Sequence, residues 1–250
     1  MDFSIPEDQK PTYSDSLSIG SKYDPVESGV YKGCTVTEAY LHKDKNNIVK
    51  QHMCYEVNGS EVSESFVVMK NGKQTEVDSK TNKEKLLWGR AAAAEVNFLI
   101  ASMDIDAITK NQKVIQLYDF EQGGKVDTTV VELAELIGKP IDLAILKTRR
   151  NKMKKVGDKF VATPDENIGN RVKKHARTSD GKTMAEIKAN TDAEFMTEWA
   201  NTYKGKTLDQ YKPVQGAATP PSSPASDVPW DNGTSNASGS SAPAVDDPFA

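Results

Sequence analysis

The chain has 250 residues, of which 37% are hydrophobic and 27% charged, and its formal net charge is −4; this length suits one good-sized domain or two small ones. The start of the chain lacks the basic and apolar regions of a signal peptide, and no apolar stretch could span a bilayer, so we expect a soluble, cytoplasmic protein. Two separated cysteines and three scattered histidines do not form the ligand pattern of a zinc site, and we expect no metal or cofactor.

A polar, proline-containing stretch opens the chain, and strand patterns follow it. Residues 1–28 are predicted to form an extended arm. Residues 29–40, 48–57 and 61–70 are rich in β-branched and aromatic side chains and largely alternate in polarity. Asn-Gly pairs follow the second and the third of these stretches, and such pairs are strong signals for tight turns. Three antiparallel strands joined by tight turns form a meander, the usual opening of a small β-barrel.

The sequence pattern changes in the middle of the chain. Residues 86–100 contain strong helix formers and predict a buried helix, with Trp88 on its apolar face. Residues 114–120 predict a strand. Residues 129–137 predict a short helix that ends at Gly138. These helices would accompany the barrel as accessory elements.

The most basic part of the chain comes next. Between Lys139 and Lys182 there are 13 lysines and arginines but only 5 acidic residues, although the whole chain is acidic. Residues 141–161 predict a strand that continues into a long β-hairpin with its tip near Gly157. A loop is expected after Thr163-Pro164. One strongly basic element therefore stands within an acidic protein.

Two short helices and a low-complexity tail complete the pattern. Capping-box patterns at 183–186 and 191–194 predict the two helices. From residue 213 onward Pro, Ser, Ala and Asn predominate, and residues 216–250 contain four aspartates but no lysine or arginine. Such a segment cannot bury enough apolar area to offset its ordering entropy. We therefore predict a folded domain over residues 29–212 and a disordered acidic tail over 213–250.

Two parts of the chain resemble single-stranded DNA-binding proteins. The C-terminal residues Asp246, Asp247, Pro248 and Phe249, here followed by Ala250, resemble the acidic Pro-Phe tip of the bacterial proteins. The body, from about residue 25 to 180, resembles the proteins of this class that bacteriophages encode. It shares with them Gly29-Val30-Tyr31 at the entry to the first strand, a helix after the third strand, and Leu136-Ile137-Gly138-Lys139-Pro140 before the basic strand.

The resemblance implies both a fold and a function. The expected fold is mainly β (α+β): an OB-type β-barrel with a long basic β-hairpin, a few accessory helices and a disordered tail. The expected function is sequence-independent binding and protection of single-stranded DNA during phage DNA replication and recombination, in the cytoplasm of the bacterial host. The tip residues Asp246, Asp247, Pro248 and Phe249 would recruit replication or recombination proteins.

Binding an unpaired strand requires cations along the phosphates and flat side chains on which bases stack. Because side chains alternate along a strand, Lys147 and Arg149 share one face of the predicted hairpin and Arg150 lies on the other. For stacking we select three aromatic residues in or near predicted strands: Tyr40, Tyr55 and Phe160. The predicted phosphate contacts are Lys147, Arg149, Arg150, Lys152, Lys154, Lys155, Lys173, Lys174 and Arg177.

Two other functions fit parts of the sequence. Pro164-Asp165, followed by Glu186-Ile187-Lys188, imitates the PD…ExK pattern of magnesium-dependent nucleases, in which carboxylates hold the metal. In those enzymes the Glu and Lys lie on a strand, whereas Glu186 here fits a helix cap. The other alternative is a phage adaptor or scaffold protein without DNA binding, which explains the tail but leaves the basic hairpin without a role. The sequence shows no nucleophile triad and no phosphate loop, so we expect no enzyme activity.

Overall fold

Three long strands from the N-terminal part of the chain form the centre of the fold. The computed structural model describes residues 25–119, 122–157 and 159–214. Within it β1 (Gly29–Lys43), β2 (Ile48–Val57) and β3 (Ser60–Lys70) pair antiparallel in sequence order. Asn58 adopts a φ of 51° in the β2–β3 turn, a left-handed conformation that asparagine tolerates better than most residues. The predicted meander is confirmed.

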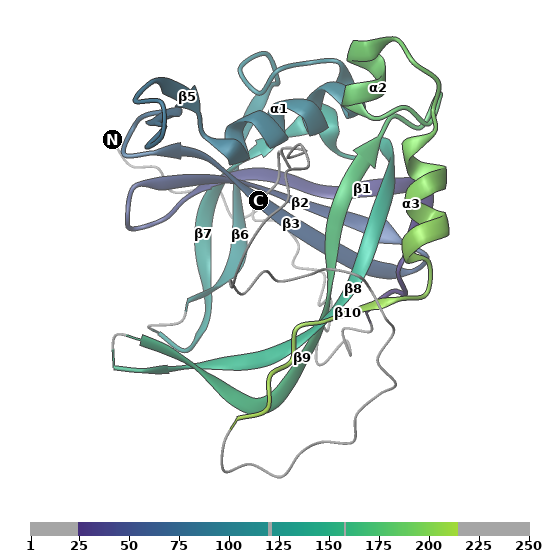
Figure 1. Ribbon diagram of the computed structural model, residues 1–250. Coiled ribbons are helices and arrows are strands. Elements are labelled where there is room, and N and C mark those ends of the chain that lie inside the picture. The colour runs from purple at the N-terminus through teal and green to yellow at the C-terminus, as the bar shows by residue number, and fades with distance from the viewer. Residues whose placement is uncertain (1–24, 120–121, 158, 215–250) are drawn as a thin grey trace, which may run out of the picture.

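Later strands extend this sheet and project from it (Figure 1). The first part of β1 pairs with β8, β8 pairs with β9, and the last part of β1 pairs with β7, all antiparallel. The bounds of these strands are β6 (Lys110–Asp119), β7 (Gly124–Leu133), β8 (Pro140–Val156) and β9 (Lys159–Ala176). The short β10 (Thr207–Asp209) runs parallel to β8, while β4 (Thr75–Val77) and β5 (Glu84–Leu86) form a separate pair.

The fold is mainly β, and among the described strands no backbone ladder closes the large sheet. The path β9-β8-β1-β2-β3 gives β3 and β9 only one described partner strand each. These two edges nevertheless meet through side chains, because Nε2 of His175 on β9 lies 2.6 Å from Oε1 of Glu64 on β3. The sheet is therefore strongly curled, and a polar contact links its edges.

The main hydrophobic core lies between the curled sheet and α1 (Trp88–Ala101). A Cβ on Gly89 would lie 2.5 Å from the backbone N and O of Val67, so the helix approaches β3 too closely for any larger residue. Inside the contact, the buried side chains of Gln51 and Asn97 exchange hydrogen bonds of 2.7 and 3.2 Å. The helix predicted over 86–100 is confirmed, but its Trp88 is 56% exposed and not part of the core.

The remaining helices differ in part from the prediction. The helix expected over 129–137 is wrong: β7 continues to Leu133, and only the 3-10 helix η2 (Ala134–Leu136) follows. The capping box at Thr183 is confirmed at the start of α2 (Met184–Ala189). The box expected at 191–194 does not form; instead Oε1 of Glu186 accepts hydrogen bonds from the backbone N–H groups at the start of α3 (Phe195–Tyr203). Met196 and Trp199 of α3 pack on the outer side of β8.

Candidate nucleic-acid interface

The β8–β9 hairpin is the longest paired element of the structure. Its ladder runs from the Asp142–Ala176 pair to the Val156–Lys159 pair, and Gly157 has a φ of 60° at the tip. The predicted hairpin and its tip are confirmed. The loop expected after Thr163 is wrong, because β9 is continuous and accommodates Pro164 at a register shift between Asn151 and Met153.

One face of the hairpin is engaged with the rest of the chain. Arg149 is only 8% exposed, and its guanidinium donates to both carboxylate oxygens of Glu166 at 3.0 and 2.6 Å and to Asp209 at 2.9 Å. The hydrogen bond to Glu166 is the largest cause of a raised pKa of Arg149, and the bond to Asp209 adds to it. In return, Arg149 lowers the pKa of Glu166. The phosphate contact predicted for Arg149 is less favoured than one by an unpaired cation, because its donors already hold two carboxylates of the protein.

Other predicted cations also have acidic partners. Nζ of Lys147 lies 2.5 Å from Oε1 of Glu27, and Arg177 forms an ion pair with Asp180 at 2.5 Å. Lys173 is exposed and Lys174 half-buried on β9. The side chain of Lys155 lies outside the described residues. Lys147 and Arg177 are therefore less direct candidates for phosphate contacts than cations without an acidic partner.

The basic row of the hairpin consists of Arg150, Lys152 and Lys154, which alternate along β8 and are all exposed. None of the three forms an ion pair with any residue in the described ranges. At the 3.3 Å rise of a strand the row is about 13 Å long. It therefore offers three closely spaced positive charges without a neutralising partner in the described part of the chain.

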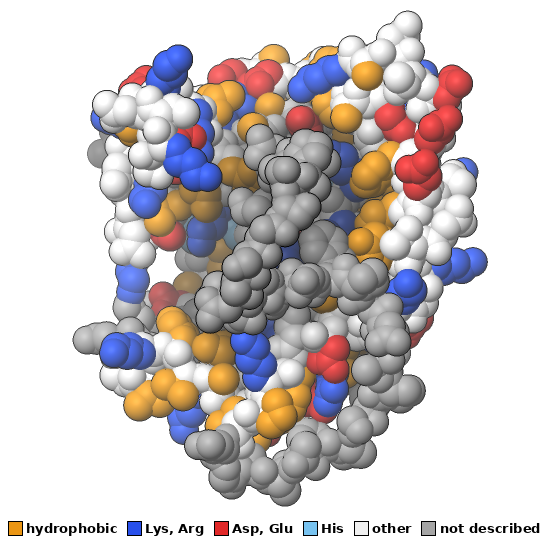
Figure 2. Space-filling view, viewed as in Figure 1, with side chains coloured by type: hydrophobic (Ala, Val, Ile, Leu, Met, Phe, Trp, Pro, Cys, Tyr) orange, Lys and Arg blue, Asp and Glu red, His pale blue; other side chains and the backbone are white. Residues whose placement is uncertain are grey.

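Exposed apolar side chains occur on both faces of the hairpin tip: Val161 pairs with Lys154 and shares the face of the basic row, whereas Phe160 pairs with Lys155 and lies on the opposite face. Met153, Val156, Phe160 and Val161 are between 49% and 68% exposed, and Phe160 is the most exposed of them. On the face shown in Figure 2, Lys or Arg and hydrophobic side chains are interspersed over the lower part of the molecule, where Figure 1 places β8 and β9. An unpaired nucleic-acid strand requires both cations and exposed rings, and the hairpin tip carries them on its two faces. Phe160 thus remains a stacking candidate.

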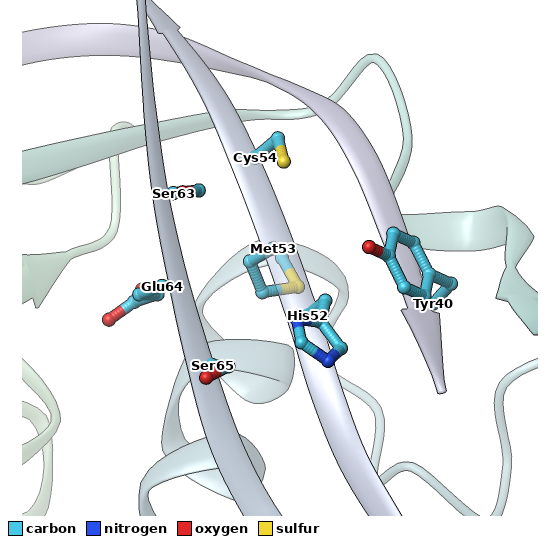
Figure 3. A pocket seen from close by; sticks show the side chains of 7 residues that line it. All are labelled: Tyr40, His52, Met53, Cys54, Ser63, Glu64 and Ser65. Carbon is cyan, nitrogen blue, oxygen red and sulfur yellow. The ribbon is translucent and has the colours of Figure 1, made fainter. Parts of the chain in front are cut away.

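A second feature is an open hollow of about 250 Å³ on the outer side of β1, β2 and β3. Figure 3 shows Tyr40 and His52 side by side on neighbouring strands, with Ser63 and Ser65 on the third. The Tyr40 and His52 rings stack at 5.0 Å. Tyr40 is only 9% exposed, so its ring forms a wall of the hollow and not an open platform. Burial raises the pKa of Tyr40 to about 12.

His52 is the site residue that sequence reasoning missed. Its Nε2 is buried without a hydrogen-bond partner among the described residues. Burial, and then the nearby His42 and Lys50, lower the pKa of His52 to about 4, so the ring is neutral near pH 7. A single histidine in a strand carries no signal for this; only its pairing opposite Tyr40 in the β1–β2 register brings the two rings together.

The expected stacking role of Tyr55 is wrong. Its side chain has no accessible surface, and its hydroxyl donates to Oε1 of Glu64 at 2.7 Å. Burial, reinforced by this carboxylate, raises the pKa of Tyr55 well above its usual value. Tyr55 therefore belongs to the core and supports the Glu64–His175 contact between β3 and β9.

Comparisons with known proteins found no matching family model, no matching curated protein and no matching solved structure. No helix among the described residues is long and apolar enough to cross a membrane. The predicted tip residues Asp246, Asp247, Pro248 and Phe249 lie outside the described ranges. The assignment of a function therefore depends on the geometry of the hairpin and the hollow.

Glu186, the central acid of the nuclease pattern, is engaged in capping helices. Oε2 of Glu186 accepts hydrogen bonds from N and Oγ1 of Thr183, while Oε1 accepts from N of Glu194 and N of Phe195. Both oxygens thus cap helices, which accounts for this carboxylate without a metal. Over the described ranges no three His, Cys, Asp or Glu side chains are grouped as metal ligands would be.

Proposed function

We propose that this protein binds single-stranded DNA without sequence preference, with the β8–β9 hairpin as the main contact. The observation that carries the proposal is the combination of three unpaired, exposed cations with the 68% exposed ring of Phe160 on one hairpin. Cations alone would serve any polyanion, whereas an exposed ring on the same hairpin suits a strand whose bases are unstacked.

The strand order supports an OB-type barrel, partly open, as the framework of this interface. In the cyclic order β1-β2-β3-β9-β8, four of the five neighbouring pairs are ladders, and the Glu64–His175 contact lies at the fifth. Helix α1 follows the third strand. In OB folds the face of strands two and three and the loop between strands four and five bind oligonucleotides. Those positions correspond here to the hollow beside His52 and to the hairpin tip at Gly157.

The experiment is a comparison of a labelled single-stranded oligonucleotide with the matching duplex by fluorescence anisotropy, over a series of salt concentrations. Single strands of different composition are expected to bind alike and more tightly than the duplex. Affinity should fall as salt rises, because phosphate contacts release counterions, with a log–log slope of about −0.7 per contact. Equal affinity for duplex, or affinity independent of salt, would contradict the proposal.

The predicted tail adds a second element to this proposal. We propose that Phe249, with Asp246 and Asp247, recruits replication or recombination proteins of the phage or its host. The support is compositional: an aromatic residue and two charges stand at the end of a segment without lysine or arginine. An apolar pocket with a basic rim on a partner would complement that tip.

A further inference from the structure

Two asparagine side chains of the β8–β9 hairpin form hydrogen bonds with the backbone near the two ends of the described chain. Asn151 on β8 donates from Nδ2 to O of Lys212 and accepts at Oδ1 from N of Lys212, both at 2.9 Å. Asn170 on β9 does the same with Val26, at 2.7 and 2.9 Å. Each amide satisfies both backbone groups of one residue, as a neighbouring strand would. Val26 and Lys212, near the two ends of the described chain, are therefore held by the same hairpin.

The N-terminal attachment also brings negative charge to this hairpin. Glu27 forms the 2.5 Å ion pair with Lys147, and its side chain is 64% exposed. The adjacent Ser28 is buried and accepts at Oγ from N of Lys147 at 2.7 Å. The N-terminal end of the described chain is thus joined to β8 by the Glu27–Lys147 ion pair and by the hydrogen bond from N of Lys147 to Ser28.

The residues that precede Pro25 also carry an excess of negative charge. Residues 1–24 contain two lysines, Lys10 and Lys22, and five acids: Asp2, Glu7, Asp8, Asp15 and Asp24. Fully extended, 24 residues span up to about 80 Å, whereas Lys147 and Lys154 are about 23 Å apart along β8. The segment is therefore long enough to reach every cation of the hairpin.

We propose that this acidic N-terminal segment, fastened by Asn170, competes with single-stranded DNA for the basic row of the hairpin. The inference rests on the proposed function, since it concerns the regulation of the same site. Attachment at the root of the hairpin makes the contact intramolecular, at an effective concentration on the order of millimolar. A two-stranded ribbon is no thicker than the Debye length of about 10 Å at 0.1 M salt, so acids near either face act on the row.

The test compares three variants with the wild-type chain, using anisotropy of a labelled oligothymidylate at low and high salt. The first variant, D8N/D15N/D24N, removes three acids from the segment. The second, E84Q/D192N/E198Q, is the matched control: it removes three exposed acids that have no ion pair within the described ranges. The third, Asn170→Ala, loosens the attachment at Val26 without changing the charge.

At low salt the segment variant should bind about three- to tenfold more tightly than wild type, and clearly more tightly than the control of equal charge. Asn170→Ala should shift affinity in the same direction. These gains should shrink at high salt because the competition is screened. If the segment variant gains no more than the control while wild type binds in a salt-dependent manner, the inference is overturned and the proposed function stands. If wild type does not bind at all, it is the proposed function that fails.

Discussion

The guanidinium carbon of Arg149 lies 4.8 Å from the centroid of the Tyr211 ring. Arg149 thereby joins the hairpin to the last described residues of the chain: it stacks on Tyr211, pairs with Asp209, and accepts at its carbonyl from N of Gln210 at 2.8 Å. The hydroxyl of Tyr211 donates to O of Pro164 on β9 at 2.9 Å. The segment 209–211 therefore contacts both strands of the hairpin.

Replacing Arg149 should affect stability and not the salt dependence of DNA binding. Arg149→Ala leaves Glu166 and Asp209 without their common partner, and we expect a loss of about 2–4 kcal/mol in the free energy of unfolding. Arg149→Lys keeps the charge but not the fork of donors, so its loss should be intermediate. Urea unfolding measures both. A smaller salt slope for DNA binding with unchanged stability would restore Arg149 as a phosphate contact.

The triple variant R150A/K152A/K154A should weaken binding to all single strands alike. Removal of three phosphate contacts should reduce the magnitude of the log–log salt slope by about 2. The variant K32A/K80A/K83A, which removes three exposed lysines elsewhere, controls for net charge. Circular dichroism should be unchanged, because the row is exposed. Equal losses in the two variants would mean that only net charge matters.

Phe160→Ala should lower affinity without altering the fold. A stacked base contributes about 1–3 kcal/mol, so the dissociation constant should rise roughly 5- to 150-fold. Phe160→Trp should restore binding, since any aromatic face can stack a base. Phe195→Ala removes a 39% exposed ring on α3 and serves as the control. The expected role of Phe160 is ruled out if its loss costs no more than that of Phe195.

His52 should make stability fall in mild acid. Its pKa is about 4 in the folded chain and about 6.5 when unfolded. Between these values the unfolded chain binds a proton that the native chain does not, so the free energy of unfolding decreases as pH falls from about 6.5 toward 4. His52→Gln should lose less stability than wild type over this interval, as followed by urea midpoints. A pH dependence unaltered by His52→Gln would contradict the assignment.

Removing residues 246–250 should separate the two roles proposed for the tail. The acidic tip is expected to compete weakly with DNA, so truncation should modestly tighten binding at low salt. It should also abolish capture of replication or recombination proteins from host extract. Identical captured proteins for full-length and truncated chains would leave the tail with a solubilising role, and unchanged DNA affinity would eliminate competition by the tip.

The elements that local sequence determines were predictable. Alternation and the Asn58-Gly59 turn indicated β2 and β3, and Thr183 with Glu186 indicated the start of α2. Residues 129–137 were misleading because Glu132, Leu133, Ala134 and Glu135 are compatible with a helix. In the structure Glu132 and Leu133 pair with Asn111 and Lys110 of β6, and this tertiary pairing outweighs helix propensity.

The site was less predictable, since partners distant in sequence decide which cations are free. Arg149, unlike Arg150, faces Glu166 and Asp209, which lie 17 and 60 residues away. Tyr55 and Phe160 both occur in strands, yet the first is enclosed by the core and the second is exposed. Alternation separates the two faces of a strand, but it does not show which face the rest of the chain will cover.

The amide pair between Gln51 and Asn97 restricts how α1 can rest on the sheet. Apolar contacts tolerate sliding, because leucine or valine packs acceptably against many neighbours. Two amides that bond each other in a dry interior do not, since a displacement by one helical turn would leave buried donors and acceptors unpaired. The pair thus selects one docking of the helix among several of similar hydrophobic content. A core without it could keep its compactness and still lose a single defined arrangement.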